Sequence, residues 1–203
     1  MQYLSTIHKA TSPKLVALKQ YSQKHDVPII LDETSRFLSQ LIRLKNVKNV
    51  LEIGTAIAYN ALNLALEFPS LRITTIERNP DMILEAKSNI KAVAPSSHIT
   101  LIEQDALDVD TKTLESFDLI FIDAAKAQHI KFFEAYEPLL NPNGMIVIDN
   151  VLFHNVSVEH VKSRNLKQLI KKVDRFNHYI MERSDYHSVI HPIGDGVCLS
   201  IKR

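Results

Sequence analysis

The chain has 203 residues, of which 45% are hydrophobic and 23% are charged, and its formal net charge is +1. This composition predicts one globular domain with a sizeable core and argues against general binding of polyanions. The apolar runs are far shorter than the roughly 20 residues of a membrane span, and the N-terminus has no apolar signal core, so we expect a cytoplasmic protein without membrane contact.

The N-terminal half predicts helices followed by alternating strands and helices. Segments 14–25 and 33–44 have helical apolar spacing, which indicates added lid or dimer helices. Asn79 and Pro80 indicate the start of a later helix, since Asn caps well and Pro fits a first turn. The β-rich runs lie at 49–53, 72–77, 98–103, 118–123 and 145–149. Such alternation predicts an α/β, Rossmann-like fold with a mostly parallel sheet covered on both faces.

The C-terminal segment predicts a different arrangement. Residues 159–181 have the apolar stripe of a long amphipathic helix. Residues 186–191 and 197–202 flank PIGDG, whose glycines suit a turn, so we expect an antiparallel hairpin that completes a seven-stranded sheet. We therefore predict one domain, 1–203, with an N-terminal helical segment at 1–45 and a catalytic core at 46–203.

Acidic residues follow the first three strands, at the edge where open parallel sheets bind ligands. Glu52 and Gly54 end the first strand, Glu77 lies 23 residues beyond Gly54, and Asp105 follows the third strand. Glu77 is near the spacing at which an acid binds ribose hydroxyls, so these residues favour a pocket for an adenosine-bearing molecule. Each acid alone is about as well explained as an ordinary strand-end residue.

A dinucleotide is the first competitor for such a pocket. The turn GTAIAY has one of the three glycines of G-x-G-x-x-G, which give a pyrophosphate its close seat on a helix N-terminus. A cofactor without phosphates, S-adenosylmethionine, therefore fits better.

Four stretches carry a family resemblance: VLEIGTAIAYNAL, TIERNPDMILEAKSNI, DLIFIDAAKAQHIKFFEAYEPLLNPNGMIVIDNVLF and PIGDGVCLSIKR. They resemble class I, S-adenosylmethionine-dependent O-methyltransferases of the catechol and caffeoyl-CoA type, from about Pro28 to Arg203. Within that family the chain looks most similar to the bacterial tRNA 5-hydroxyuridine methyltransferases, which methylate wobble uridines modified at position 5. VPIILDE, LEIGTAIAY, the basic segment before DRFNHYIM, and PIGDG support this finer resemblance.

The resemblance implies roles for individual residues. Asp123, Asp149 and Asn150 stand where the family binds a divalent metal, usually Mg²⁺, and Lys126 stands at the lysine regarded as the catalytic base. Asp123 is thereby also a candidate catalytic and donor-binding residue. The remaining donor-binding candidates are Glu52, Gly54, Tyr59, Asn60, Glu77, Asp105 and Ala106. Two carboxylates and an amide oxygen suit a hard cation such as Mg²⁺.

Two positions depart from the family pattern. Ala58 replaces a common glycine, so its methyl could crowd the methionine end of the donor, and Asn60 replaces a common serine. These departures support an alternative of another class, a non-catalytic module that binds S-adenosylmethionine or RNA.

The acceptor has two candidates, because catechols and 5-hydroxyuridine present the same pair of adjacent oxygens to a metal. A stripe of Arg164, Lys167, Lys171 and Arg175 on the expected C-terminal helix could bind the phosphates of a tRNA anticodon stem-loop. Charge alone slightly favours an ordinary solvated helix face, whereas the resemblance favours tRNA over a small catechol. The family also leads us to expect a homodimer formed through the N-terminal helices.

Overall fold

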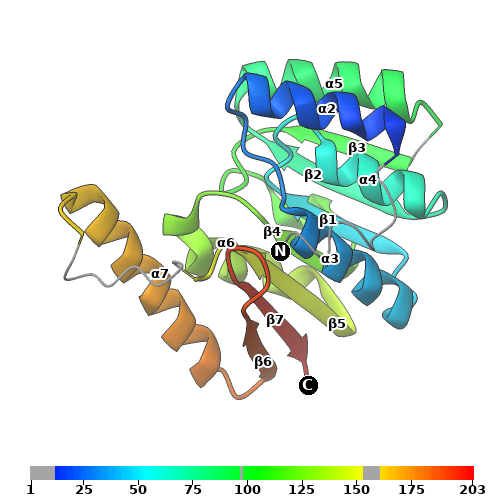
Figure 1. The fold of residues 1–203 in the computed structure, drawn as a ribbon. Helices are drawn as coiled ribbons and strands as arrows, with labels where there is room; N and C mark the ends of the chain where they lie inside the picture. Colours follow the sequence, from blue (N-terminus) through cyan, green and yellow to red (C-terminus); the bar gives the residue numbers. More distant parts are fainter. Residues whose placement is uncertain (1–11, 97, 153–160) are drawn as a thin grey trace.

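A computed structural model describes residues 12–96, 98–152 and 161–203. Its centre is a seven-stranded sheet in the order β3-β2-β1-β4-β5-β7-β6 (Figure 1). The parallel strands are β1 (Asn49–Ile53), β2 (Arg72–Glu77), β3 (His98–Glu103), β4 (Phe117–Ile122) and β5 (Leu140–Asp149). Antiparallel β6 (Tyr186–His191) and β7 (Val197–Lys202) complete the sheet beside β5. The predicted fold class, including the C-terminal hairpin, is confirmed.

Helices cover both faces of this sheet (Figure 1). The helices are α2 (Pro13–Lys24), α3 (Asp32–Lys45), α4 (Tyr59–Glu67), α5 (Pro80–Val93), α6 (His129–Tyr136) and α7 (Arg164–Glu182), with 3₁₀ turns η1 (Thr111–Thr113), η2 (Lys126–Gln128) and η3 (Glu137–Leu139). Helices α2 to α5 share one hydrophobic cluster with the sheet, and α6 and α7 share the other. None of the helices in the described ranges is long and apolar enough to cross a membrane.

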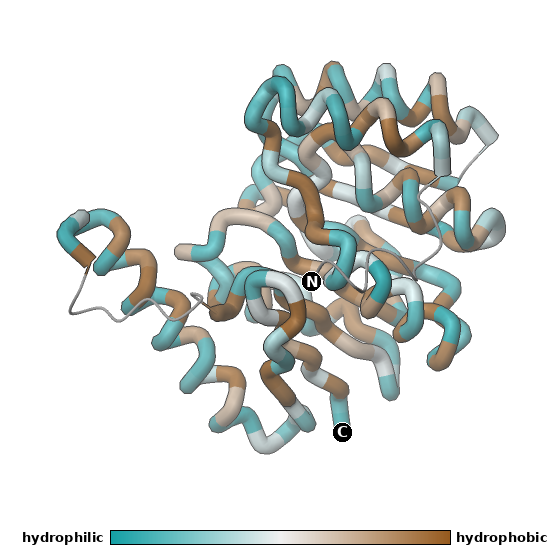
Figure 2. Tube along the Cα trace, viewed as in Figure 1, coloured by the Kyte–Doolittle hydropathy of each residue, from teal (hydrophilic) through white to brown (hydrophobic). Residues whose placement is uncertain are grey.

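The two clusters explain why β4 is apolar on both of its faces from Leu119 to Ile122. In β4, Leu119 and Phe121 face the α2–α5 side, whereas Ile120 and Ile122 face α6 and α7. Successive side chains of a strand point to opposite faces, so a strand covered on both sides has no polar face. Hydrophobic residues accordingly lie along the strands in the middle of the trace (Figure 2).

Helix α5 begins as the sequence predicts. Asn79 is its N-cap, and the Asn79 side chain accepts hydrogen bonds from the backbone N–H groups of Asp81 and Met82. Pro80 occupies the first turn, where its missing N–H costs no hydrogen bond.

Two predicted boundaries are wrong. Helix α7 begins at Arg164, because Ser163 acts as its N-cap and accepts a hydrogen bond from the N–H of Leu166. Residues 161–163 are therefore not helical, and 159–160 lie outside the described residues. Strand β5 begins at Leu140 rather than at 145, because Leu140 already pairs with Phe117 before a register irregularity.

Candidate active site

The main cavity lies where the strand order reverses. The chain passes from β1 outward through β2 and β3, then returns to β4 on the other side of β1, and ligands bind at such a switch point. The cavity has a volume of about 940 Å³. Its lining includes all the predicted donor, metal and catalytic residues: Glu52, Gly54, Tyr59, Asn60, Glu77, Asp105, Ala106, Asp123, Lys126, Asp149 and Asn150.

Gly54 brings the ends of β1 and β4 into backbone contact. Its φ is +103°, and a Cβ atom there would lie 2.3 Å from the carbonyl oxygen of Asp123. The N–H of Asp123 in turn donates to the carbonyl oxygen of Ile53 at 2.9 Å. Only glycine fits this approach. It places residues 54–58, the predicted donor loop, directly against Asp123, the first predicted metal ligand.

A buried carboxylate, that of Glu52, is hydrogen-bonded to residues next to the donor loop. Glu52 is 2% exposed and accepts hydrogen bonds from Asn60 Nδ2 at 2.8 Å and Thr75 Oγ1 at 2.6 Å. Thr55 Oγ1 lies 2.6 Å from Thr75 Oγ1, so its hydroxyl donates to Thr75, whose one proton is used on Glu52. Burial raises the pKa of Glu52 to about 7, against the opposing effect of these two hydrogen bonds.

Asn60 thus uses its amide nitrogen on Glu52. Its Oδ1 is buried and has no hydrogen-bond partner within the described part of the chain. A buried amide oxygen at a cavity wall can accept a hydrogen bond from a ligand N–H group.

Glu77 and Asp105 form the outer part of this half. Glu77 accepts hydrogen bonds from the backbone N–H of Ala56 at 2.9 Å and from that of Asn79 at 2.9 Å. Asp105 binds Arg78 Nη1 at 2.8 Å, and hydrogen bonds from the Leu107 N–H and from Arg78 lower its pKa. Both carboxylates lie at the cavity rim and accept hydrogen bonds there.

Ala58 does not line the cavity. Its φ is +64°, in the left-handed region that favours glycine, and its side chain is fully buried in the core. The methyl that was expected to crowd the donor therefore packs away from the cavity, and the cost of this position lies in the backbone conformation.

The other half of the cavity contains two carboxylates near one amine. Asp149 is 2% exposed, Asp123 is half-buried, and Lys126 begins the η2 turn. Burial and repulsion by Asp123 raise the pKa of Asp149, while burial and repulsion by Glu52 raise that of Asp123, with Lys126 opposing both shifts. Like charges close together disfavour the ionised form of a carboxylate, and a cation bound between them would relieve that repulsion.

The donor set fits a hard dication. Within the described ranges, no group of three or more His, Cys, Asp or Glu side chains has the arrangement of a metal site. The predicted set instead combines two carboxylates with the amide of Asn150, which leaves positions open for water or substrate oxygens, as Mg²⁺ prefers.

Asp195 was read from the sequence only as part of a turn. The structure places it in the cavity wall, close enough to raise the pKa values of both Asp123 and Asp149. A signal was present in PIGDG: the chain enters β7 there, and antiparallel pairing with β5 brings this turn beside Asp149.

Two further segments line the cavity, although the sequence analysis did not predict them as part of the site. The loop between α2 and α3 lines the cavity with residues 25–31, and α7 contributes Leu169. Leu169 was assigned only to an apolar helical stripe, because periodicity does not distinguish a core position from a cavity wall.

The four basic residues of α7 do not reach the cavity. Arg164, Lys171 and Arg175 are exposed and Lys167 is half-buried, and none of them lines it. At 3.6 residues per turn Arg164, Lys171 and Arg175 lie opposite the packed residues Val173 and Phe176, and Lys167 lies at the border of the packed face, beside Ile170. Figure 2 shows the corresponding alternation of hydrophobic and hydrophilic residues along α7.

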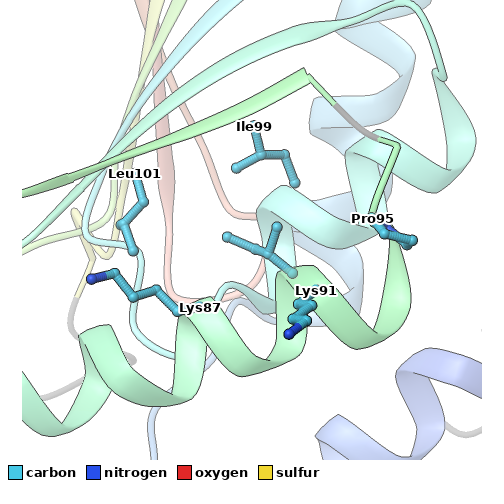
Figure 3. A pocket seen from close by; sticks show the side chains of 6 residues that line it. Lys87, Lys91, Pro95, Ile99 and Leu101 are labelled. Atoms are coloured by element: carbon cyan, nitrogen blue, oxygen red, sulfur yellow. The ribbon is translucent and has the colours of Figure 1, made fainter.

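A second hollow, of about 330 Å³, lies between α5 and the edge strand β3 (Figure 3). Ile99 and Leu101 reach from β3 toward the helix, and Lys87 is paired with Glu103 at 2.6 Å. Its lining has two lysines and four apolar residues, without a carboxylate, hydroxyl or thiol. The groups needed for catalysis therefore lie in the main cavity.

Comparisons with known proteins identify the family of this chain. The family model described as O-methyltransferase matches residues 5–203. A protein of Arabidopsis thaliana, provisionally named a caffeoyl-CoA O-methyltransferase, is 30% identical over 162 residues, which cover 78% of this chain and 67% of that protein.

Two solved structures extend the likeness to the whole fold. A Staphylococcus aureus protein, also provisionally named a caffeoyl-CoA O-methyltransferase, is 39% identical with a TM-score of 0.93, covering 100% of this chain and 98% of that one. An O-methyltransferase of tomaymycin synthesis from Streptomyces achromogenes, solved with S-adenosylmethionine, is 25% identical with a TM-score of 0.81, covering 98% and 94%.

Proposed function

This chain belongs to the O-methyltransferase family, and from that premise we propose that it methylates wobble 5-hydroxyuridine of tRNA, with S-adenosylmethionine as donor and a divalent metal. The chain is a methyltransferase enzyme, so the non-catalytic alternative is not pursued. One observation carries the proposal: Asp123, Asp149, Asn150 and Lys126 line the same cavity as the donor loop.

The donor half suits the two ends of S-adenosylmethionine. Glu77 and Asp105 offer carboxylate oxygens to ribose hydroxyls and to the adenine edge. The unpartnered Oδ1 of Asn60 offers an acceptor to the ammonium group of the methionine part. Gly54 lets the donor approach the backbone closely.

The acceptor half suits two adjacent oxygens. Asp123, Asp149 and Asn150 would hold the dication, which when bound lowers the pKa of a coordinated hydroxyl. Lys126 accepts the proton of the acceptor hydroxyl. The acceptor oxygen then forms its bond to the methyl carbon as the carbon–sulfur bond breaks in line, leaving a thioether. The rigid ends of β4 and β5 supply much of the catalysis by holding the reacting atoms aligned.

Two features support tRNA as the acceptor: the sequence resemblance described above and the exposed basic residues of α7, which form a surface for phosphates outside the cavity. A small caffeoyl-type or catechol acceptor is the second candidate, favoured by the names of the relatives. We further propose that the chain works as a homodimer.

The deciding experiment compares acceptors directly. Purified protein is incubated with labelled donor and either hypomodified tRNA, a catechol or caffeoyl-CoA, with and without EDTA. We expect transfer to tRNA that EDTA stops, and loss of 5-methoxyuridine-type nucleosides from the tRNA of cells lacking the protein. Unchanged tRNA nucleosides, together with transfer to a small phenol, would establish the second candidate.

A further inference from the structure

Val151, which follows the predicted metal ligands Asp149 and Asn150, is hydrogen-bonded by two other segments of the chain. Val151 is 1% exposed, and its N–H donates to the carbonyl oxygen of Gly196, in the hairpin turn, at 3.0 Å. The carbonyl oxygen of Val151 accepts a hydrogen bond from Asn177 Nδ2, on α7, at 2.8 Å. Both backbone polar groups of Val151 are therefore used by segments distant in sequence.

Asn150 needs such support because its backbone is in an uncommon conformation. Its φ is +61°, in the left-handed region, which costs a residue other than glycine roughly 1 kcal/mol or more. Its N–H donates to Asp149 Oδ1 at 2.7 Å. This bend turns the chain at the end of β5, so that Asp149 and Asn150 both line the cavity.

Within the part of the chain that the structure describes, the Asn177 side chain makes its hydrogen bond to Val151 alone. It is not part of the cavity lining, and its Oδ1 is buried without a partner within the described residues. Its amide orientation is fixed by the Val151 carbonyl, since only the nitrogen can donate. Removing this donor would leave a buried carbonyl unsatisfied.

We propose that Asn177 is a positioning residue for the acceptor site. By holding the Val151 carbonyl, it keeps Asn150 in the left-handed conformation in which Asn150 lines the cavity beside Asp149. The inference rests on the proposed function for the role of Asn150 as a metal ligand. It also joins α7, whose outer face is basic, to the residues that would bind the metal.

The test measures Mn²⁺ binding by electron paramagnetic resonance, separately from catalysis. Asn177→Leu keeps a similar volume but removes the donor, and Asn165→Leu is the matched control at an exposed position of the same helix. We expect Mn²⁺ binding roughly tenfold or more weaker in Asn177→Leu, as for partners that orient metal ligands. Donor affinity, measured by calorimetry, should stay within about twofold of wild type, and the control should match wild type in both.

A double-mutant cycle separates positioning from a general loss of structure. Asn150→Gly removes the ligand side chain and relieves the left-handed strain, so adding Asn177→Leu to it should weaken Mn²⁺ binding no further. Equal additional losses in both backgrounds would overturn the proposal, as would wild-type Mn²⁺ affinity in Asn177→Leu. If Asn177→Leu does not fold, the isosteric Asn177→Asp takes its place with Asn165→Asp as control.

Mn²⁺ binding to Asp149→Ala distinguishes an error in the proposed metal site from an error in the role of Asn177. If Asp149→Ala binds Mn²⁺ as wild type does, the metal site itself is wrong, and the role of Asn177 falls with it. If Asp149→Ala loses binding while Asn177→Leu and Asn177→Asp keep it, only the positioning role is wrong.

Discussion

Gly54 and Asp123 touch backbone to backbone: a Cβ atom on Gly54 would lie 2.3 Å from the Asp123 carbonyl oxygen and 2.9 Å from its carbon. The loop that would carry the donor and the loop that would carry the metal are thus one packed unit. Backbone atoms have no rotamers with which to relieve a clash, so any change at Gly54 must move one of these loops.

Gly54→Ala should therefore damage both stability and donor binding. Overpacking and the positive φ predict a loss of about 2–4 kcal/mol in the free energy of unfolding, measured by urea denaturation. Displacement of the loop predicts donor affinity roughly tenfold or more weaker, measured by calorimetry. Gly144→Ala is the control: its Cβ would also clash, at 2.8 Å from the Asn141 carbonyl oxygen, but far from the cavity lining. Normal donor affinity in folded Gly54→Ala would contradict this account.

Thr75→Val tests the buried support of Glu52. The substitution keeps the shape but removes the hydroxyl that donates to Glu52 Oε2, which should cost about 1–3 kcal/mol at pH 8, where the carboxylate is ionised. The cost should be smaller at pH 5, because that hydrogen bond favours the ionised form and opposes the rise of the Glu52 pKa to about 7. Thr100→Val, on exposed β3, should be neutral at both pH values; a pH-independent cost at Thr75 would argue against the interpretation.

His129→Phe should make the free energy of unfolding less dependent on pH between about pH 4 and 6.5. Burial and repulsion by Lys126 lower the pKa of His129 to about 4, and the ring is 1% exposed against Phe176. Between pH 6.5 and 4 the unfolded chain binds a proton that the folded chain does not, so this contribution is complete above pH 6.5 and is lost as pH falls. The difference between wild type and variant should change by about 3 kcal/mol across that window.

Urea titrations at several pH values between 4 and 7 measure this difference directly. Exposed His178→Phe is the matched control for the loss of an imidazole. Parallel curves for wild type and His129→Phe would mean that folding does not change the pKa of His129, which would contradict the prediction.

Some residues of this site are marked by local sequence motifs, whereas others depend on how distant segments pack together. Asp123 and Asp149 each follow an apolar run, and the family resemblance assigned both to one metal site before their place in the sheet was known. Asn177 and Leu169 carry no such signal, because their roles depend on how α7 docks. Helix docking is decided by long-range packing, which a one-dimensional pattern does not record.

The starts of α5, α7 and β5 also differ in how well the local sequence predicts them. Asn79 and Pro80 mark a helix start with two independent signals, and the prediction held. At the start of α7, the cap is Ser163 alone, and the apolar spacing continues N-terminal to it, so periodicity extended the helix too far. The start of β5 depends on pairing with Phe117, which no local residue preference indicates.

Asp149→Asn should have opposite effects with and without metal. In EDTA it removes a buried charge whose pKa is raised by burial and by Asp123, so the free energy of unfolding should rise by about 2 kcal/mol at pH 8. In millimolar Mg²⁺, wild type should gain stability by mass action, whereas the variant should gain little. Thermal unfolding in the two buffers checks this, with Asp118→Asn, a carboxylate that accepts hydrogen bonds from Lys48 and Asn141 outside the cavity, expected to be destabilised in both.

Reversing the charge of the α7 stripe tests the RNA surface. Lys167→Glu, Lys171→Glu and Arg175→Glu together replace three positive charges by negative ones at positions outside the cavity lining, so donor binding should be unchanged. If these residues contact phosphates, methylation of hypomodified tRNA should be lost, and the salt dependence of tRNA binding should decrease by roughly one unit of slope for each contact removed. A filter-binding titration over several salt concentrations measures that slope.

The matched control for this prediction reverses three exposed lysines elsewhere, Lys24, Lys45 and Lys112, and so changes the net charge by the same amount. If a general field attracts tRNA, the two triple variants should weaken binding equally, because net charge acts at a distance. If α7 forms the docking surface, only the first variant should lose tRNA binding, and donor affinity should stay at the wild-type value in both. Unchanged tRNA methylation in the α7 variant would remove the stripe from the RNA-binding surface and leave the small phenolic acceptor as the stronger candidate.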